Sequence, residues 1–122
     1  MTLRGLRVLV LEDEPIIALA IEDALFELGA TPVLAERVAD AEAALAEGGF
    51  DAAILDVNLH GQRSYPVALA LAALGLPFIF ATGYGDAEHP DALRDVPTIT
   101  KPYGRADIAA AFAPLAPAGR LR

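Results

Sequence analysis

Four short apolar runs in this chain end in side chains that suit a site where phosphate is handled. They are Glu12 and Asp13 after LRVLVL, Asp56 after FDAAIL, Thr82 after PFIFA, and Lys101 with Pro102 after PTIT. Each run is typical of a buried strand, and ligands bind at the carboxyl ends of the strands in an open α/β sheet. Three acids, one hydroxyl and one ammonium at such ends predict a cation site beside a nucleophile.

The three carboxylates indicate a divalent cation. Two like charges ~4 Å apart, at an effective dielectric constant of ~20, repel each other by about 4 kcal/mol. A fold that gathers three acids either protonates one of them or binds a cation, and Mg²⁺ (or Mn²⁺) is the usual cation where phosphate is handled. We expect Asp13 and Asp56 to be direct ligands, and Glu12, which has the longer reach, to hold a metal-bound water.

A carboxylate in such a site can also act as a nucleophile and form an aspartyl phosphate. Lys101 and Thr82 would then bind phosphoryl oxygens, and Gly83 would leave room for the incoming group. Each residue also has a structural explanation, because the acid pair could cap a helix, Asp56 and Thr82 could be turn residues, and Lys101 could be solvated. Their shared position at strand ends favours the chemical interpretation over coincidence.

The composition narrows the choice of partners and compartment. The chain has 17 acids, 9 bases, a formal charge of −8 and no cysteine. Nucleic acid and anionic membranes are therefore poor partners, and thiolate chemistry is excluded. His60 and His89 stand alone in polar loops, which is typical of solvated side chains. The stretch Ser64–Gly85 is uncharged, but Gly75 and Pro77 divide it, and the first residues do not form a signal peptide, so we predict a cytoplasmic protein with no membrane span.

Strand-like and helix-like segments alternate along the chain. The predicted strands are Leu6–Leu11, Thr31–Ala35, Phe50–Asp56, Leu76–Ala81 and Pro97–Thr100. The predicted helices run from Pro15 to a stop at Gly29, over Ala39–Glu47 and over Ser64–Leu74. In a last helix Ile108, Phe112 and Leu115 are spaced for one face, and Pro114 is expected to end that helix early. Val57–Arg63 is predicted to be a loop, and Asp86–Asp95, with Pro90 in its middle, a short or irregular helix.

Five βα repeats predict an α/β fold, a flavodoxin-like (βα)5 doubly wound parallel sheet with helices on both faces. Right-handed crossovers restrict the topology. The strand order 2-1-3-4-5 places strands one and three side by side at the switch point, so that Glu12, Asp13 and Asp56 meet. No linker, repeat or second domain is visible, so residues 1–122 are predicted to form a single domain, with a core at about 1–115 and a tail at 116–122.

These residues resemble the receiver domain of two-component response regulators, over nearly the whole chain. The resemblance rests on Glu12-Asp13, on Asp56 with Asn58 two positions later, on Thr82 and on Lys101-Pro102. It implies that Asp56 accepts phosphate from a histidine kinase or a histidine phosphotransfer protein, and that the Asn58 backbone carbonyl completes the metal site. It also implies a switch that catalyses its own phosphorylation and loses phosphate slowly, not a metabolic enzyme.

A narrower resemblance is to the FAT GUY subgroup of receivers. It rests on DVNL from Asp56, SYPV from Ser64 and PFIFATGYG from Pro77. Members of this subgroup are often stand-alone receivers, are found mostly in alphaproteobacteria, and tend to work with histidine kinases of the HWE or HisKA2 type.

The chain departs from typical receivers three positions before the lysine. Thr98 stands where those receivers carry an aromatic residue whose rotation accompanies phosphorylation. Tyr84, in the loop after Thr82, would either replace that aromatic residue or only pack over the site. We expect Asp86–Asp95 to be the switching segment, because its helix signal is weak and locally unstable segments are the ones that switch.

The leading prediction is a phosphoacceptor receiver whose output is a protein contact or a phosphate relay, as a monomer or weak homodimer. The acidic, partly apolar first helix would be a docking face for a phosphotransfer helix, or an exposed amphipathic helix with no partner. A phosphate sink and a non-phosphorylated structural adaptor remain alternatives. An aspartyl-phosphate phosphatase would carry D-x-D after the first strand, and a nucleotide-binding module would carry glycines there, whereas this chain has LEDEP.

Overall fold

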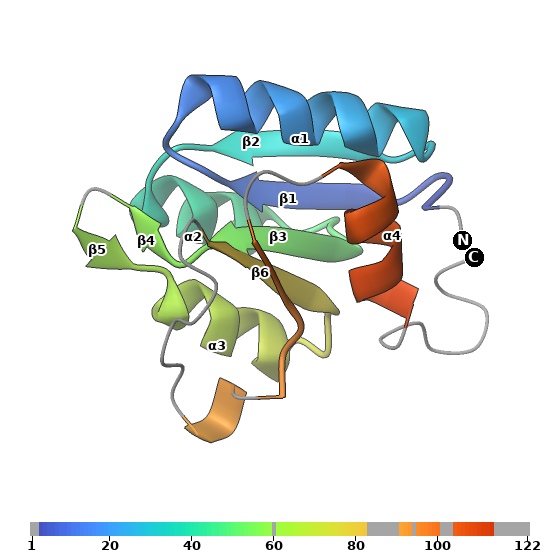
Figure 1. The fold of residues 1–122 in the computed structure, drawn as a ribbon. Helices are drawn as coiled ribbons and strands as arrows, with labels where there is room; N and C mark the ends of the chain where they lie inside the picture. The colour runs from blue at the N-terminus through green and yellow to red at the C-terminus, as the bar shows by residue number, and fades with distance from the viewer. Residues whose placement is uncertain (1–2, 60, 83–90, 94, 101–103, 114–122) are drawn as a thin grey trace.

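The computed structural model describes residues 3–59, 61–82, 91–93, 95–100 and 104–113 (Figure 1). In this part of the chain, five strands form one sheet in the order β2-β1-β3-β6-β7. The strands are β1 (Arg7–Leu11), β2 (Thr31–Ala35), β3 (Ala52–Asp56), β6 (Phe78–Thr82) and β7 (Thr98–Thr100). All neighbouring pairs in this sheet are parallel. Because β6 and β7 are its fourth and fifth strands along the chain, the predicted order 2-1-3-4-5 is confirmed.

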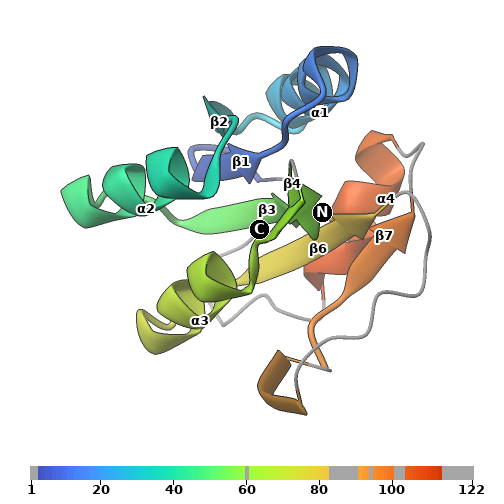
Figure 2. The same ribbon diagram turned by 90° about the vertical axis from the view of Figure 1, so that its left-hand side faces the viewer.

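Helices cover both faces of the sheet (Figure 2). The helices are α1 (Pro15–Glu27), α2 (Val38–Glu47), α3 (Tyr65–Ala73) and α4 (Arg105–Phe112), with a 3-10 turn at Asp91–Leu93. Helices α2 and α3 pack on one face, where Leu9, Leu55 and Phe80 point, and α1 and α4 pack on the other, where Val10, Ile54 and Ile79 point. The strands β3 and β6 are buried at every position, which explains their continuous apolar sequences.

Helix α1 forms as its sequence pattern predicts. Pro15 stands in the first turn, and Ala18, Ile21, Ala24 and Leu25 are buried on one face. The helix stops at Gly29, whose backbone has φ +86°. A Cβ atom there would lie 3.0 Å from Arg4 Cα, so both the dihedral angle and the space require glycine.

The segment Val57–Arg63, which we predicted to be a loop, is instead largely a β-hairpin. Its strands are β4 (Asn58–Leu59) and β5 (Gln62–Arg63), which pair antiparallel. Leu59 is buried and fixes the hairpin to the core, and Gly61 adopts φ +80° in the turn. Strands of two residues are too short for the alternation that identifies a strand in a sequence, which explains the wrong prediction.

Other element boundaries differ from the predictions by one or two residues. β3 begins at Ala52, not Phe50, and β6 begins at Phe78 and includes Thr82, which we had placed after the strand. Of the segment Asp86–Asp95, the 3-10 turn at Asp91–Leu93 agrees with a short helix, whereas residues 86–90 and 94 lie outside the described residues.

Arg7 joins the amino ends of the central strands, at the edge of the sheet opposite to Asp56. Its backbone N–H donates to Asp51 Oδ2 at 2.9 Å, and its Nη1 donates to the Gly48 carbonyl at 3.1 Å. The guanidinium lies 4.4 Å from the centre of the Phe50 ring, a distance typical of a cation–π contact.

β2 is an outer strand of the sheet and contains Pro32. The Thr31 N–H donates to the Leu6 carbonyl at 2.8 Å, so Thr31 faces β1 with its backbone donor. None of the helices in the described ranges is long and apolar enough to cross a membrane.

Candidate functional site

Three carboxylates meet at the carboxyl ends of β1 and β3. One carboxylate oxygen from each of Glu12, Asp13 and Asp56 lies within 4.8 Å of the other two. Glu12 is 2% exposed and Asp56 is 6% exposed, while Asp13 is half-buried. Since acids are almost never fully buried without a partner, this grouping is unlike a solvated acidic surface and matches the predicted cluster.

The parallel register of the sheet explains why these acids meet. Leu11 of β1 pairs with Leu55 of β3, so Glu12 and Asp56 both follow a paired residue at the same edge. The Glu12 N–H donates to the Ala35 carbonyl of β2 at 3.0 Å, and Glu12 Oε2 accepts from the Glu14 N–H at 3.1 Å. Glu12 therefore also fixes the turn that leads from β1 into α1.

This donor set fits a hard divalent cation. Carboxylate oxygens are the ligands that Mg²⁺ prefers, and a cation relieves the mutual repulsion of three acids. Asp13 and Asp56 are the expected direct ligands, and Glu12 the expected partner of a bound water. The Asn58 backbone carbonyl, the expected fourth donor, belongs to the hairpin residue two positions after Asp56.

Thr82 lies on the strand beside Asp56. Asp56 pairs with Ala81, so Thr82 is one position further along β6 and is 6% exposed. Thr82 in turn pairs with Thr100 on β7, the residue that precedes Lys101 in the sequence. The strand register thus brings the ends of β1, β3, β6 and β7 to one edge of the sheet, as predicted.

His60 and His89, which we expected to be solvated, lie outside the described residues. So do four predicted site residues: Gly83, Tyr84, Lys101 and Pro102. Their roles stay predictions. Thr98, the position of the missing aromatic residue, is described, and its hydroxyl donates to the Val96 carbonyl at 3.4 Å.

Two acids that the sequence analysis did not assign to the site lie near it. A cavity of about 260 Å³ is bordered by Glu22 of α1 and by Glu36 after β2, together with Glu12 and Asp13. Leu19 and Leu34 add apolar surface to this cavity. Glu36 had a recognisable signal, because it directly follows a predicted strand as the other site acids do.

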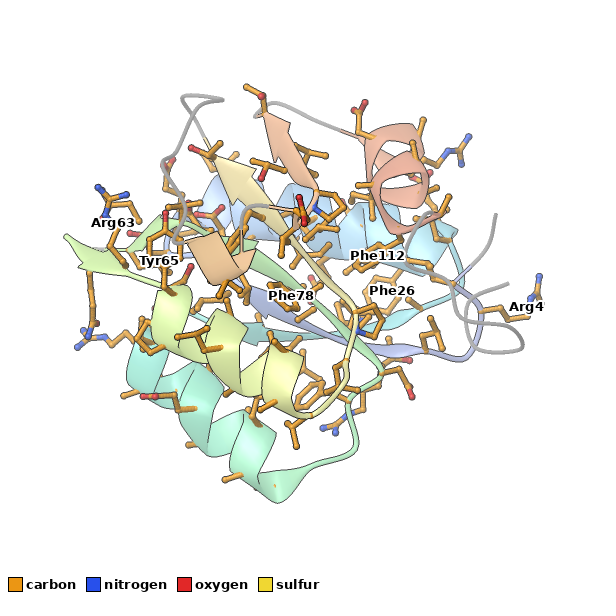
Figure 3. All side chains as sticks on the ribbon, turned by 90° about the horizontal axis from the view of Figure 1, so that it is seen from below. Arg4, Phe26, Arg63, Tyr65, Phe78 and Phe112 are labelled. Atoms are coloured by element: carbon orange, nitrogen blue, oxygen red, sulfur yellow. The ribbon has the colours of Figure 1, made fainter. Side chains whose placement is uncertain are left out.

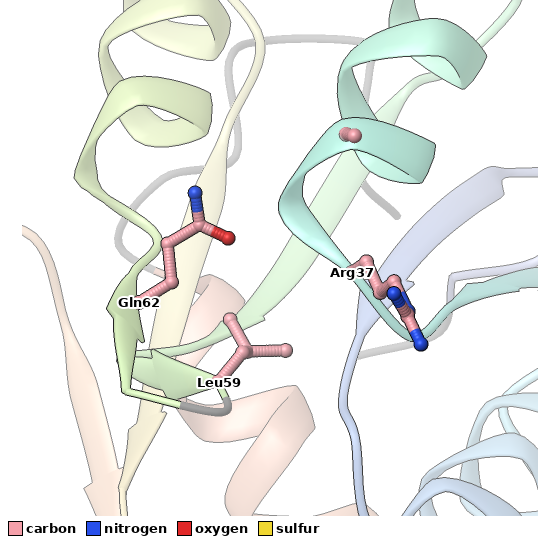
Figure 4. Close-up of a pocket in the computed structure, with 4 residues that line it drawn as sticks. Arg37, Leu59 and Gln62 are labelled. Atoms are coloured by element: carbon pink, nitrogen blue, oxygen red, sulfur yellow. The ribbon is translucent and has the colours of Figure 1, made fainter.

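A second cavity, of about 360 Å³, separates the β4–β5 hairpin from the start of α2 (Figure 4). Arg37, Ala39, Leu59 and Gln62 line it. None of the three clustered acids borders it, so it is a neighbour of the site and not part of it.

The chain is similar to several proteins of known structure. No protein-family model and no curated protein matches the chain. Among solved structures, SdrG from Sphingomonas melonis Fr1 is 47% identical, with a TM-score of 0.82, over 94% of this chain and 98% of that one. The BeF3-activated conformation of SdrG from Pseudomonas melonis Fr1 is 49% identical, with a TM-score of 0.75, over 89% and 94% of the two chains.

A more distant structure supports the fold alone. A CheY-like response regulator receiver domain from Methylobacillus flagellatus is 22% identical, with a TM-score of 0.76, over 91% of this chain and 98% of that one. The clustered acids, the strand order and the near-complete match to SdrG have a single explanation: this chain belongs to the receiver domains of response regulators.

Proposed function

We propose that this chain accepts a phosphoryl group on Asp56, with Mg²⁺ bound, from a histidine kinase or a histidine phosphotransfer protein. The observation that carries the proposal is the meeting of Glu12, Asp13 and Asp56 within 4.8 Å. The description of an SdrG structure as BeF3-activated supports it, because beryllofluoride imitates a phosphoryl group on a carboxylate.

In the proposed reaction an Asp56 carboxylate oxygen forms a bond to phosphorus while the phosphorus–nitrogen bond of a phosphohistidine breaks. A phosphohistidine that carries a proton on its other ring nitrogen leaves as neutral imidazole, so no further proton is needed. Bound Mg²⁺ would supply positive charge to the phosphoryl oxygens. Thr82 would donate its hydroxyl to one of these oxygens, and Lys101 would provide an ammonium for another.

Helix α1 is the proposed docking face for the donor. Ile16, Leu19 and Phe26 are among its exposed apolar side chains, at 84%, 56% and 59% exposure. Glu22 and Asp23 add negative charge between them. The cavity beside Leu19 continues from this face to Glu12 and Asp13, so a docked helix with basic and apolar side chains would lie next to the acceptor site.

The test is intact-mass spectrometry after incubation with Mg²⁺ and a small acyl phosphate. We expect a gain of one phosphoryl group that is lost in Asp56→Ala and without Mg²⁺. An Asp13→Asn variant should also lose the gain, because it removes a metal ligand and leaves the acceptor intact.

The same mass measurement, extended to phosphorylated kinases and combined with a measurement of Mg²⁺ binding, separates the alternatives. A chain that gains no phosphoryl group from the acyl phosphate or from any phosphorylated kinase, and binds no Mg²⁺, would be a structural adaptor. A chain that gains the group and passes it to no other protein would act through contact with a target or as a phosphate sink.

A further inference from the structure

Tyr65 connects the two strands that carry the acceptor and the hydroxyl of the site. It is the first residue of α3 and follows the hairpin that begins after Asp56. The N–H of its neighbour Ser64 donates to the Val57 carbonyl at 3.0 Å, and the Val57 N–H donates to the Ala81 carbonyl at 3.3 Å. The start of α3 is therefore tied through Val57 to the strand position next to Thr82.

The Tyr65 ring makes a second connection, to β6 directly. It meets the Phe80 ring edge to face, with 5.8 Å between centroids and an angle of 88°. Phe80 meets Phe78 in the same way, at 5.8 Å and 85°. Figure 3 shows Tyr65 at the start of α3 and Phe78 further along the same side of the sheet. Three rings thus form a ladder on one face of β6.

Thr82 belongs to that same face. Side chains two positions apart in a strand point to the same side, so Phe78, Phe80 and Thr82 are aligned along β6. Phe80 is fully buried, and its register partner on β7 is Thr98, a small side chain. Among the described residues, the aromatic contacts of Phe80 come from Tyr65 and Phe78. Removing the Tyr65 ring would therefore leave a void beside Phe80, two positions before Thr82.

We propose that Tyr65 is a positioning residue for phosphoryl transfer. Its ring fixes β6 against the start of α3 and so sets the position of the Thr82 hydroxyl relative to Asp56. The inference rests on the proposed phosphorylation of Asp56. It predicts that loss of the ring slows phosphorylation and leaves the three clustered acids in place, because Glu12 and Asp13 follow β1 and Asp56 ends β3.

The experiment compares Tyr65→Leu, Tyr65→Phe and Phe78→Leu with the wild type. For each protein, the rate of phosphorylation by an acyl phosphate and the affinity for Mg²⁺ are measured. We expect Tyr65→Leu to be roughly 10-fold slower with unchanged Mg²⁺ affinity, because small misplacements of reacting groups are costly. Tyr65→Phe keeps the ring and should restore the rate.

Phe78→Leu is the matched control, since it removes the ring at the far end of the same ladder, away from Thr82. It should lower thermal stability at least as much as Tyr65→Leu, because Phe78 is the more buried of the two, and leave the rate unchanged. Equal rates for Tyr65→Leu and wild type would overturn the proposal, as would equal slowing by Phe78→Leu or failure of Tyr65→Phe to restore the rate.

The outcomes also separate this proposal from the one on which it rests. A wild type that gains no phosphoryl group and binds no beryllofluoride with Mg²⁺ overturns both. A wild type that gains the group, with Tyr65→Leu equally fast, overturns the role of Tyr65 alone.

Discussion

Of the three clustered acids, Asp13 is the one whose substitution best distinguishes the effect of charge repulsion from the effect of metal binding. It is half-buried, whereas Glu12 also holds the turn into α1 through its contact with the Glu14 N–H, and Asp56 is the proposed acceptor. Without a cation, the negative charge of Asp13 repels those of Glu12 and Asp56. When a cation is bound, the Asp13 carboxylate becomes one of its ligands.

We therefore expect Asp13→Asn to raise the free energy of unfolding in a chelating buffer by on the order of 1 kcal/mol. Adding Mg²⁺ should raise the melting temperature of the wild type and leave that of the variant unchanged, because only the wild type binds the ion. Thermal unfolding followed by circular dichroism, with EDTA and then with Mg²⁺, measures both effects.

Glu14→Gln is the control for that measurement. Glu14 is exposed and adjacent in sequence, and its carboxylate is not one of the three that meet. This variant should keep the response to Mg²⁺. If Asp13→Asn responded to Mg²⁺ as strongly as the wild type, Asp13 would not be a ligand.

At the scale of the elements, α1 and α3 both expose apolar side chains but differ in charge. α1 combines exposed Ile16, Leu19 and Phe26 with acids, and its acidic cavity leads to the site. α3 exposes Leu69 at 48% and carries no charged residue. Because of this difference, a substitution in α3 can serve as the control for the same type of substitution in α1.

We expect Leu19→Glu to slow phosphoryl transfer from the phosphorylated kinase that reacts fastest with the wild type by roughly 10-fold or more, as for a residue in the centre of an interface. The rate with an acyl phosphate should not change, because the small donor does not use α1. Leu69→Glu should leave both rates unchanged. Equal loss in the two variants would place the docking face elsewhere.

Some features of the helices and strands were predictable from the sequence, and others were not. The ends of β1, β3 and β6 were predictable, because long apolar runs stop at Glu12, Asp56 and Thr82. The β4–β5 hairpin was not, because strands of two residues carry no periodicity. The contact of Tyr65 with Phe80 joins residues far apart in sequence and depends on how α3 packs on the sheet, which no local pattern records.

The formal charge of −8 affects the stability of the folded protein as a whole. Like charges spread over a small protein repel each other, and salt screens that repulsion. A compact state with excess acid should therefore gain stability from salt that does not bind specifically.

We expect the melting temperature to rise by a few degrees when NaCl is increased from low concentration to about 0.5 M in EDTA, since the Debye length falls well below 10 Å. The variant Asp40→Asn with Glu42→Gln removes two exposed acids of α2 and changes the charge from −8 to −6, because −8 + 2 = −6. It should respond less to NaCl. An equal response would mean that the salt effect does not come from net charge.

The outer strand β2 has a consequence for how this protein behaves when crowded. Thr31 faces β1 with its N–H, so by alternation the backbone nitrogens of Pro32 and Leu34 face the free edge. Of these two, only Leu34 has a hydrogen to donate. A second copy that paired with this edge would find no N–H at Pro32, so Pro32 disfavours edge-to-edge aggregation of the sheet.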